Sequence, residues 1–558
     1  MRYKKSNLLL VWFAIFLYGF TTIAQTNRPN RYWVMLTDKN NSTYSLQNPT
    51  SFLSSDALSR RNLQSIVIDS LDLPVNSSYV TQIKSMGVRV LFCSRWFNAV
   101  VIETDSISSQ LPAVLALPFV KNHSKVLRLK YSTDFSIEGP PNTICLNKKK
   151  EMNAYDYGQA NLQIEQLNGI CLHNLGYDGK GIHIAVLDAG FRKANQLEAL
   201  SETFLQGRLK YNVDFSYRNP IPLYSDSTNS HGTAVLSTMA ANQSGTMVGT
   251  APKSDYTLIR TEYAPDEFIM EEFSWVAGAE YADSVGCDII NSSLGYTTFD
   301  DPSQNHSFSS LDGKTSFASR AATLASRKGL IVCNSAGNGG GGAWYKIGIP
   351  ADADSIFTVG AIDSDQVLAP FSSVGPTFDG RIKPDLVALG SSATILNSYS
   401  GNVALSSGTS FSSPILAGMI ASLWSAFPEK SNMEIIKAVK ESADRFSTPD
   451  NFYGYGRPDF CAAYAILKGY NFSEDQFIPL ASNPISESYQ AEFIAKNEQD
   501  VIVTLCDVNG KQIWKNEKHL TTKSTWKLIF STVNLSSGIY FLKAQSDQFQ
   551  QTHKLIKP

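Results

Sequence analysis

The central part of the chain, from about residue 157 to residue 470, alternates short, almost continuously apolar runs with longer amphipathic stretches. The apolar runs at 181–187, 287–290 and 329–333 are too short for ordinary helices. Strands that are buried on both faces of a parallel sheet have this composition. Because helical patterns separate the runs, the sequence predicts an α/β domain with a doubly wound, mostly parallel sheet over residues 151–472.

The segment before this domain has a mixed pattern. Strand-like runs and helix-like stretches alternate at 32–36, 57–64, 97–102 and 106–117. A polar stretch then ends in three consecutive lysines at 148–150, which is typical of a linker. We therefore predict an α+β domain, together with its linker, over residues 25–150.

The pattern changes again after the central domain. Residues 501–505, 538–542 and 552–556 are strand-like, and Asn509-Gly510 is a strong hairpin signal because both residues tolerate positive φ. Residues 473–558 are therefore expected to form a small all-β, sandwich-like domain.

The first residues have the order of a secretory signal peptide. Arg2, Lys4 and Lys5 precede an uncharged run from Leu8 to Phe20, and small residues follow up to Ala24. The run is shorter than the roughly 20 residues that span a bilayer. We expect cleavage after residue 24 and no transmembrane segment in the mature chain. The protein is thus predicted to be secreted or held at the cell surface, via the periplasm.

The charge balance and the cysteine spacing argue against nucleic-acid binding and against a zinc site. The 558 residues include 48 Lys and Arg against 50 Asp and Glu, a net charge of −2, so no nucleic acid partner is expected. The seven cysteines form no CxxC pair and no Cys/His cluster with zinc-ligand spacing, and their disulfide pairing stays open. Cys287 and Cys333 lie in apolar runs, and we expect them to pack in the core.

Three polar residues stand where an α/β fold places chemistry. Asp188 ends the first apolar strand, His231 opens a helical stretch, and Ser410 precedes the helical run 415–424. Ligand sites in open α/β sheets lie beyond the carboxyl ends of the strands. A serine needs a base to attack a carbonyl, a histidine has a suitable pKa, and a buried carboxylate orients that histidine.

Each of these residues also has a plainer interpretation. Asp188 with Gly190 could form a turn, His231 could be a packing residue, and Ser410 could cap a helix. A fourth candidate is Asn338, which lies between glycines after a strand and could donate to an oxyanion or simply form a turn. The order Asp, His, Ser differs from that of chymotrypsin and of the α/β-hydrolases.

On these residues the chain from about Tyr157 to Tyr464 resembles a subtilisin-like serine endopeptidase. The matching segments are Val186-Leu187-Asp188-Ala189-Gly190, His231-Gly232-Thr233, Gly249-Thr250-Ala251-Pro252, Asn291-Ser292-Ser293-Leu294-Gly295, Ser335-Ala336-Gly337-Asn338 and Gly408-Thr409-Ser410-Phe411-Ser412-Ser413-Pro414. The resemblance implies that Asp188 orients His231, that His231 is the general base and acid, and that Ser410 is the nucleophile.

The resemblance also implies binding residues. Asn338 and the Ser410 backbone N–H would form the oxyanion hole. Ser293-Leu294-Gly295 would pair with an extended protein or peptide substrate, and Ser335-Ala336-Gly337 would form a wall of the specificity pocket. Tyr296 departs from the family pattern, in which a small residue is frequent, so the pocket's details stay open. The chemistry requires no cofactor. Many relatives bind calcium, but no oxygen-ligand run is evident, so the metal sites are unknown.

The flanking regions resemble known partners of such domains. Phe97-Asn98-Ala99 and Leu117-Pro118-Phe119-Val120 resemble the end of a subtilase prodomain, which implies a zymogen with its own prodomain as transient inhibitor. The C-terminal region resembles the sorting domain of type IX secretion cargo in Bacteroidetes-type bacteria, which implies contact with secretion machinery. A generic β accessory domain that binds carbohydrate or packs on the protease is the alternative for these residues.

Two other functions compete with a secreted serine endopeptidase. The first is a catalytically inactive adhesive or binding protein on a subtilase fold, which the presence of all three triad residues and Asn338 disfavours. The second is an esterase of the α/β-hydrolase type. That enzyme would need a Gly-x-Ser-x-Gly turn with the histidine last, whereas here Ser410 comes last and Ser412 replaces the second glycine.

Overall fold

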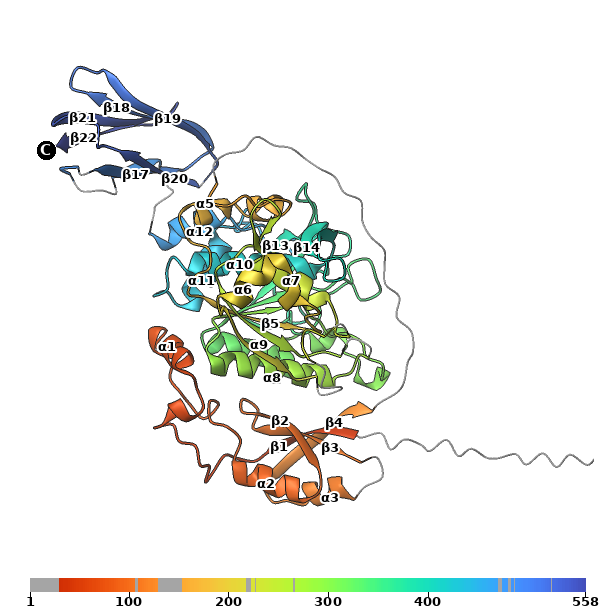
Figure 1. Ribbon diagram of the computed structural model, residues 1–558. Helices are drawn as coiled ribbons and strands as arrows, with labels where there is room; N and C mark the ends of the chain where they lie inside the picture. Colours follow the sequence, from red (N-terminus) through yellow and green to blue (C-terminus); the bar gives the residue numbers. More distant parts are fainter. Residues whose placement is uncertain are drawn as a thin grey trace, which may run out of the picture.

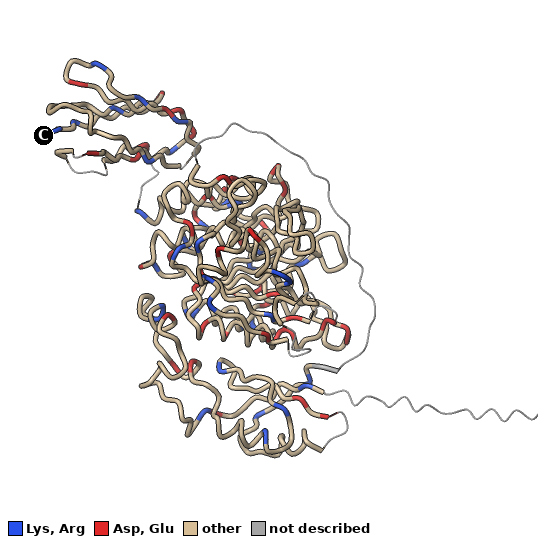
Figure 2. The backbone as a smooth tube through the Cα atoms, viewed as in Figure 1, with Lys and Arg blue, Asp and Glu red and all other residues tan. Residues whose placement is uncertain are grey.

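A computed structural model describes residues 30–105, 109–128, 153–216, 222–225, 227–263, 266–469, 474–479, 483–485, 487–522 and 524–558. The predicted signal peptide and the predicted linker lie outside the described residues. Figure 1 shows three parts in chain order: a small N-terminal domain, a large central domain and a C-terminal β domain. Acidic and basic residues are interspersed over all three parts (Figure 2).

The central domain is built on a seven-stranded sheet in the order β13-β12-β11-β10-β5-β9-β6. Its strands are β5 (His183–Asp188), β6 (Leu209–Asp214), β9 (Asp255–Arg260), β10 (Ile289–Ser292), β11 (Ile331–Ser335), β12 (Phe357–Ile362) and β13 (Leu386–Leu389). Every neighbouring pair is parallel. The predicted doubly wound sheet is confirmed, and in the described residues it is wholly parallel.

Helices cover both faces of this sheet. α7 (His231–Ala240), α10 (Thr409–Trp424), α11 (Asn432–Glu441) and α12 (Phe460–Leu467) pack on one face, and α8 (Met270–Val285) and α9 (Phe317–Arg327) on the other. Successive strand residues point to opposite faces, so Ile184 and Val186 of β5 join the first core while Ala185 and Leu187 join the second. Apolar residues on both faces explain why these strands have continuous apolar sequences.

Shorter elements complete the central domain. They are α4 (Asn161–Glu165), α5 (Ile170–Asn174), α6 (Ser201–Leu205), the pair β7 (Asn242–Gln243) and β8 (Met247–Val248), and the hairpin β14 (Ala393–Leu396) with β15 (Val403–Ser406). A disulfide between Cys171 and Cys461 joins α5 to α12. Cys287 and Cys333 are free and buried, as predicted.

The N-terminal domain is an antiparallel sheet in the order β2-β3-β1-β4 with helices α2 and α3 on one side, whereas α1 packs against α8. Its elements are β1 (Asn30–Leu36), α1 (Ser55–Leu63), α2 (Ser77–Ser85), β2 (Arg89–Ser94), β3 (Ala99–Thr104), α3 (Gln110–Leu115) and β4 (Val120–Arg128). The strand predicted at 97–102 begins two residues later. The reason is that Asn98 has a φ of 47° and its side-chain amide donates to the carbonyls of Leu36 and Asp38, which holds residues 97–98 in a turn.

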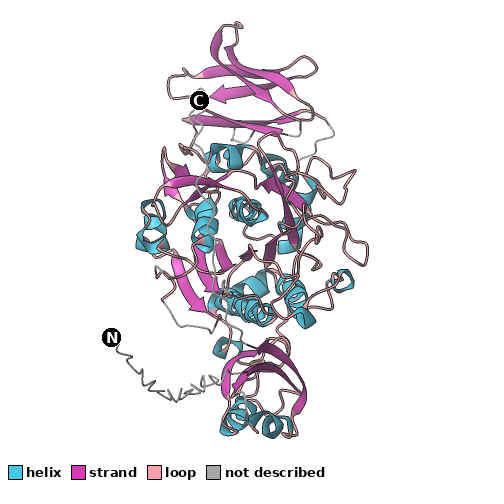
Figure 3. Cartoon of the chain, turned by 90° about the vertical axis from the view of Figure 1, so that its right-hand side faces the viewer, coloured by secondary structure: helices cyan, strands magenta, loops and turns pink. Residues whose placement is uncertain are grey.

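The C-terminal domain contains two antiparallel sheets, seen at the top of Figure 3. One is ordered β16-β17-β20 and the other β19-β18-β21-β22. The strands are β16 (Gln476–Pro479), β17 (Ser488–Ala495), β18 (Gln499–Asp507), β19 (Gln512–Leu520), β20 (Ser524–Ser531), β21 (Gly538–Gln545) and β22 (Gln550–Lys557). The predicted Asn509-Gly510 turn joins β18 to β19, and Gly510 has a φ of 79°.

Candidate active site

Asp188 and His231 form a hydrogen-bonded pair at the carboxyl edge of the sheet. Asp188 is the last residue of β5 and is fully buried, and His231 is the first residue of α7. His231 Nδ1 lies 2.9 Å and 3.0 Å from the two carboxylate oxygens of Asp188. Burial alone would lower the pKa of His231, but the charge and hydrogen bond of Asp188 raise it above its usual value. The carboxylate therefore fixes the imidazole and favours its protonated form.

Ser410 lies at the start of a buried helix beside this pair. It is the second residue of α10, and the ring of the next residue, Phe411, is 6.1 Å from the His231 ring. The Ser410 hydroxyl donates to the Ser293 carbonyl at 3.5 Å. In the described residues it makes no hydrogen bond to His231, so the hydroxyl has to turn before it can donate to the imidazole. Such bonds are often loose without substrate.

Asn338 has a fixed amide orientation next to Ser410. Its Oδ1 accepts from the Thr409 N–H at 2.9 Å and from the Thr409 hydroxyl at 3.0 Å. A backbone N–H can only donate, so Oδ1 must face Thr409 and Nδ2 must face away from it. Within the described part of the chain, Nδ2 has no acceptor. A Cβ at Gly408 would lie 3.4 Å from Nδ2, so the glycine keeps space open around this donor.

The segment that follows β10 presents unused backbone groups. Ser293 and Leu294 are buried, whereas Gly295 is exposed. The Leu294 carbonyl is already occupied, because Asn334 Nδ2 donates to it at 3.1 Å. Among the described residues the Gly295 N–H and C=O have no backbone partner, and the position of a Cβ there is nearly open. Free groups of this kind on an extended segment can accept a peptide as an added strand.

Ser335, Ala336 and Gly337 lie beside this segment. Ser335 and Ala336 are buried, and the Ser335 hydroxyl donates to the Leu294 carbonyl at 3.4 Å. Gly337 has a φ of 107°, which strongly favours glycine, and its N–H donates to the Thr409 hydroxyl at 3.1 Å. The structure thus brings the predicted pocket wall, Asn338 and the start of α10 together.

Tyr296 interacts with three glutamates, Glu262, Glu267 and Glu271, and the sequence did not predict this interaction. The Tyr296 side chain is fully buried and its hydroxyl donates to Glu262, so it points into the core. Burial and repulsion from neighbouring glutamates raise the pKa of Glu262 and Glu271 well above the usual value. Burial and the charge of Asp300 raise the pKa of Glu267 to about 7. Glu262 accepts from the Tyr296 hydroxyl, and Glu271 accepts from the Tyr263 N–H at 2.9 Å.

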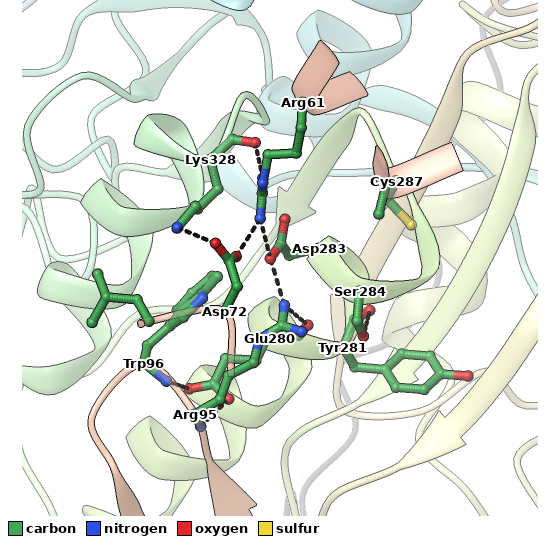
Figure 4. Close-up of polar contacts among 12 residues, drawn as sticks. Arg61, Asp72, Arg95, Trp96, Glu280, Tyr281, Asp283, Ser284, Cys287 and Lys328 are labelled. Atoms are coloured by element: carbon green, nitrogen blue, oxygen red, sulfur yellow. Dashed lines mark hydrogen bonds and ion pairs between the residues drawn. The ribbon is translucent and has the colours of Figure 1, made fainter. Parts of the chain in front are cut away.

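The N-terminal domain covers α8 and α9 through a buried charge cluster (Figure 4). Arg60, Arg61 and Arg95 of that domain all contact the carboxylate of Asp283 on α8, which is fully buried. Burial would raise the pKa of Asp283, but the three guanidinium groups lower it below its usual value. Asp72 extends the cluster, because it lies 2.8 Å from Arg61 and 2.7 Å from Lys328 of the central domain.

A second contact caps the turn between β2 and β3. The Glu280 carboxylate on α8 accepts from the Arg95 N–H at 2.8 Å, from the Trp96 N–H at 3.2 Å and from the Ser94 hydroxyl. No local pattern predicts the contacts of Asp283 and Glu280, because their partners in the N-terminal domain lie more than 180 residues earlier in the chain.

The described ranges contain neither a metal-binding cluster nor a membrane-spanning helix. There, no group of three or more His, Cys, Asp or Glu side chains is arranged to hold a metal ion. None of the helices described is both long and apolar enough to cross a bilayer.

Comparison with known proteins identifies the central domain. The family description "Subtilase family" matches residues 179–456. Subtilisin DY of Bacillus licheniformis is 30% identical over 287 residues, which cover 50% of this chain and 89% of that protein. The chain belongs to the subtilase family. Subtilisin NAT of Bacillus subtilis subsp. natto is similar, with 29% identity over 308 residues, 54% of this chain and 71% of that protein.

The flanking domains and the fold also match. "Peptidase S8 propeptide domain, Bacteroidota" matches residues 31–138, and "Secretion system C-terminal sorting domain" matches residues 483–558. The solved epidermin leader peptide processing serine protease of Staphylococcus aureus shares the fold, with a TM-score of 0.51 and 16% identity over 79% of this chain and 99% of that one. The protein is a subtilisin-family serine endopeptidase with a propeptide and a sorting domain, and it belongs with secreted or cell-surface proteins.

Proposed function

We propose that the protein hydrolyses peptide bonds through Asp188, His231 and Ser410. The observation that carries this proposal is the Asp188–His231 pair, which lies beside the helix that presents Ser410. Asp188 selects the tautomer with a proton on Nδ1, which leaves Nε2 free to act as a base.

Ser410 Oγ attacks the carbonyl carbon of the scissile bond while its proton moves to His231 Nε2. The carbonyl π electrons move to oxygen, and the resulting oxyanion accepts from Asn338 Nδ2 and from the Ser410 N–H. When the tetrahedral intermediate collapses, the C–N bond breaks and His231 gives its proton to the departing amine. Water then attacks the acyl-enzyme by the same proton route and releases Ser410.

The substrate binds in this proposal as an added strand. The N–H and C=O of Gly295 pair with the extended peptide, together with the backbone of Ser293 and Leu294. Ser335, Ala336 and Gly337 form one wall of the pocket for the side chain before the scissile bond. Main-chain pairing explains how proteins of varied sequence could bind, whereas the pocket selects among them.

The propeptide makes the protein a zymogen, and we propose that it is also the transient inhibitor of the site. The sorting domain would address the exported chain from the periplasm to type IX secretion machinery. For the chemistry we propose no cofactor, because Ser410, His231 and Asn338 supply all the groups needed. A chelator should therefore leave the initial rate of peptide hydrolysis unchanged, and a lost rate that calcium restores would reveal a structural metal site.

The direct test is peptide hydrolysis by purified variants. Ser410→Ala should lower kcat by about 10⁶, and Asn338→Ala should lower it by roughly 10²–10³ with little change in KM. Ser412→Ala is the matched control, because it removes a buried hydroxyl from the same helical turn and should keep most of the activity. Comparable kcat values for Ser410→Ala and the wild type would refute the assignment.

A further inference from the structure

The first turn of α10 contains a proline that leaves one backbone group without its helical partner. In a helix the carbonyl of Ser410 would accept from the N–H of residue 414. Residue 414 is a proline inside α10 and has no N–H. The carbonyl of Ser410 therefore needs another donor, because an unpaired buried carbonyl is costly.

Ser293 supplies this donor. Its hydroxyl lies 2.9 Å from the Ser410 carbonyl oxygen, and both residues are buried. In the opposite direction, the Ser410 hydroxyl contacts the Ser293 carbonyl at 3.5 Å. The segment that pairs with substrate in the proposed function is thus joined directly to the residue that attacks it.

Two further side chains fix the direction of these bonds. Asn291 Nδ2 lies 3.2 Å from the Ser293 hydroxyl, and the Ser413 hydroxyl lies 2.9 Å from Asn291 Oδ1. A carbonyl can only accept, so the Ser293 hydroxyl must donate to Ser410, and Asn291 must present its Nδ2 to Ser293. Its Oδ1 is then left to accept from Ser413.

The geometry of the two elements explains why these residues meet. Asn291 and Ser293 are two positions apart on an extended segment and face the same side, toward α10. Ser292 faces the other side, where its hydroxyl accepts from the Trp275 indole of α8 at 2.9 Å. Ser410 and Ser413 are three positions apart on a helix and share a face. Asn291 and Ser413 are completely buried, so water does not compete for these bonds.

We propose that Asn291, Ser293 and Ser413 form a hydrogen-bonded relay that positions the nucleophile relative to bound substrate. The proposal rests on the proposed function, because it assumes that Ser410 attacks a peptide held at residues 293–295. Asn291 and Ser413 act as positioning residues through Ser293. Reaction rates depend steeply on such alignment, and a displacement of about 1 Å can cost roughly 10²-fold.

The test is a double-mutant cycle on Ser293 and Pro414 in the full chain, with kcat expressed per active site titrated by a serine-directed phosphonate. Ser293→Ala should lower kcat about 10- to 100-fold and leave KM within about twofold. In the Pro414→Ala background, the new N–H can bond the Ser410 carbonyl, so the same substitution should lower kcat by less than about threefold. An equal loss in both backgrounds would overturn the relay.

Asn291→Ala keeps the proposal falsifiable if Pro414→Ala does not fold. This variant should lower kcat about tenfold per titrated site, whereas Ser412→Ala should keep the wild-type value. Ser412 donates to the carbonyl of Thr409, which retains a helical donor at residue 413. A purely structural role would lower the unfolding temperature and the titrated fraction but leave kcat per site unchanged, which would overturn the proposal. An active Ser410→Ala would instead refute the proposed function.

Discussion

The two domains attached to the catalytic domain are joined to it in different ways. The propeptide shares a hydrophobic core with the catalytic domain: Trp33 packs against Phe273 and Phe317, with ring centroids 4.5 Å and 5.4 Å apart. Among the described residues, the core of the sorting domain is formed by that domain's own side chains, between Phe477 and Leu555. The propeptide therefore packs against the catalytic domain through a common core, whereas the sorting domain has a core of its own.

The propeptide and the sorting domain also differ in the burial of their ion pairs. The propeptide places three arginines around the buried Asp283. A buried charge is tolerated only when an opposite charge and hydrogen bonds compensate it. Removal of one member of a buried ion pair therefore leaves the other charge uncompensated and destabilises the interface. In the sorting domain, by contrast, ion pairs such as Lys515–Glu517 are exposed and contribute little. The propeptide interface is therefore specific and sensitive to substitution.

The largest effect on propeptide docking is expected from a substitution in the core that the propeptide shares with the catalytic domain. Trp33→Ala should weaken docking of the propeptide by about 4 kcal/mol, because it leaves a cavity against Phe273 and Phe317. Calorimetry on the Ser410→Ala chain, which cannot cleave itself, should show the joint transition of propeptide and catalytic domain split or fall, while the sorting domain transition stays in place. Unchanged joint melting would contradict the shared core.

A somewhat smaller effect is expected at the charge cluster. Asp283→Asn should weaken docking by about 3 kcal/mol, because Arg60 and Arg95 then lose their ion-pair partner and Arg61 keeps only Asp72. The active chain should release its propeptide sooner after cleavage, measured as the fraction of propeptide that copurifies with mature enzyme. Glu517→Gln is the control and should behave as wild type. If both variants retained the propeptide equally, the cluster would not be an anchor.

A substitution in the core of the sorting domain should affect that domain alone. Leu542 is fully buried in that domain's own core. Leu542→Ala should destabilise the sorting domain by about 2–3 kcal/mol and leave the melting of the rest unchanged. A joint shift of both transitions would show that the two cores are coupled.

Local patterns in the sequence predicted individual strands and site residues. They could not predict contacts between residues that are far apart in the chain. The strands near 181, 287 and 329 and the placement of Asp188, His231 and Ser410 followed from local patterns. The Arg60–Asp283 contact spans 223 residues and the disulfide spans 290, and no local pattern encodes either. Helix α2 was missed because its only buried residue is Ile83, too little for a clear apolar stripe.

The same limit applied within the active site. Family motifs contained Asn291, Ser293 and Ser413, yet their hydrogen bonds appear only when β10 meets α10 in the fold. Tyr296 left the details of the predicted pocket open, since it follows Leu294-Gly295 where relatives often have a small residue. Its contact with Glu262 was not predictable, because Glu262 lies 34 residues earlier in the chain.

The smallest expected effect on catalysis comes from removal of the sorting domain. A chain that ends at Gly469 keeps α12 and the Cys171–Cys461 disulfide. Its kcat should change by less than about twofold, because the two cores are separate. In the native host the truncated chain should remain in the periplasm, as measured by cell fractionation. Its normal appearance outside the cell would rule out the sorting role.

The central claim, that Ser410 is a nucleophile activated by His231 and Asp188, is tested most directly by locating the covalent adduct of a serine-directed phosphonate by mass spectrometry. We expect one adduct, on Ser410, which forms quickly in the mature enzyme, slowly while the propeptide is bound, and about 10⁴-fold more slowly in Asp188→Asn. An adduct on another serine, or hydrolysis of peptides by an enzyme that Ser410 labelling does not inactivate, would refute the role of Ser410.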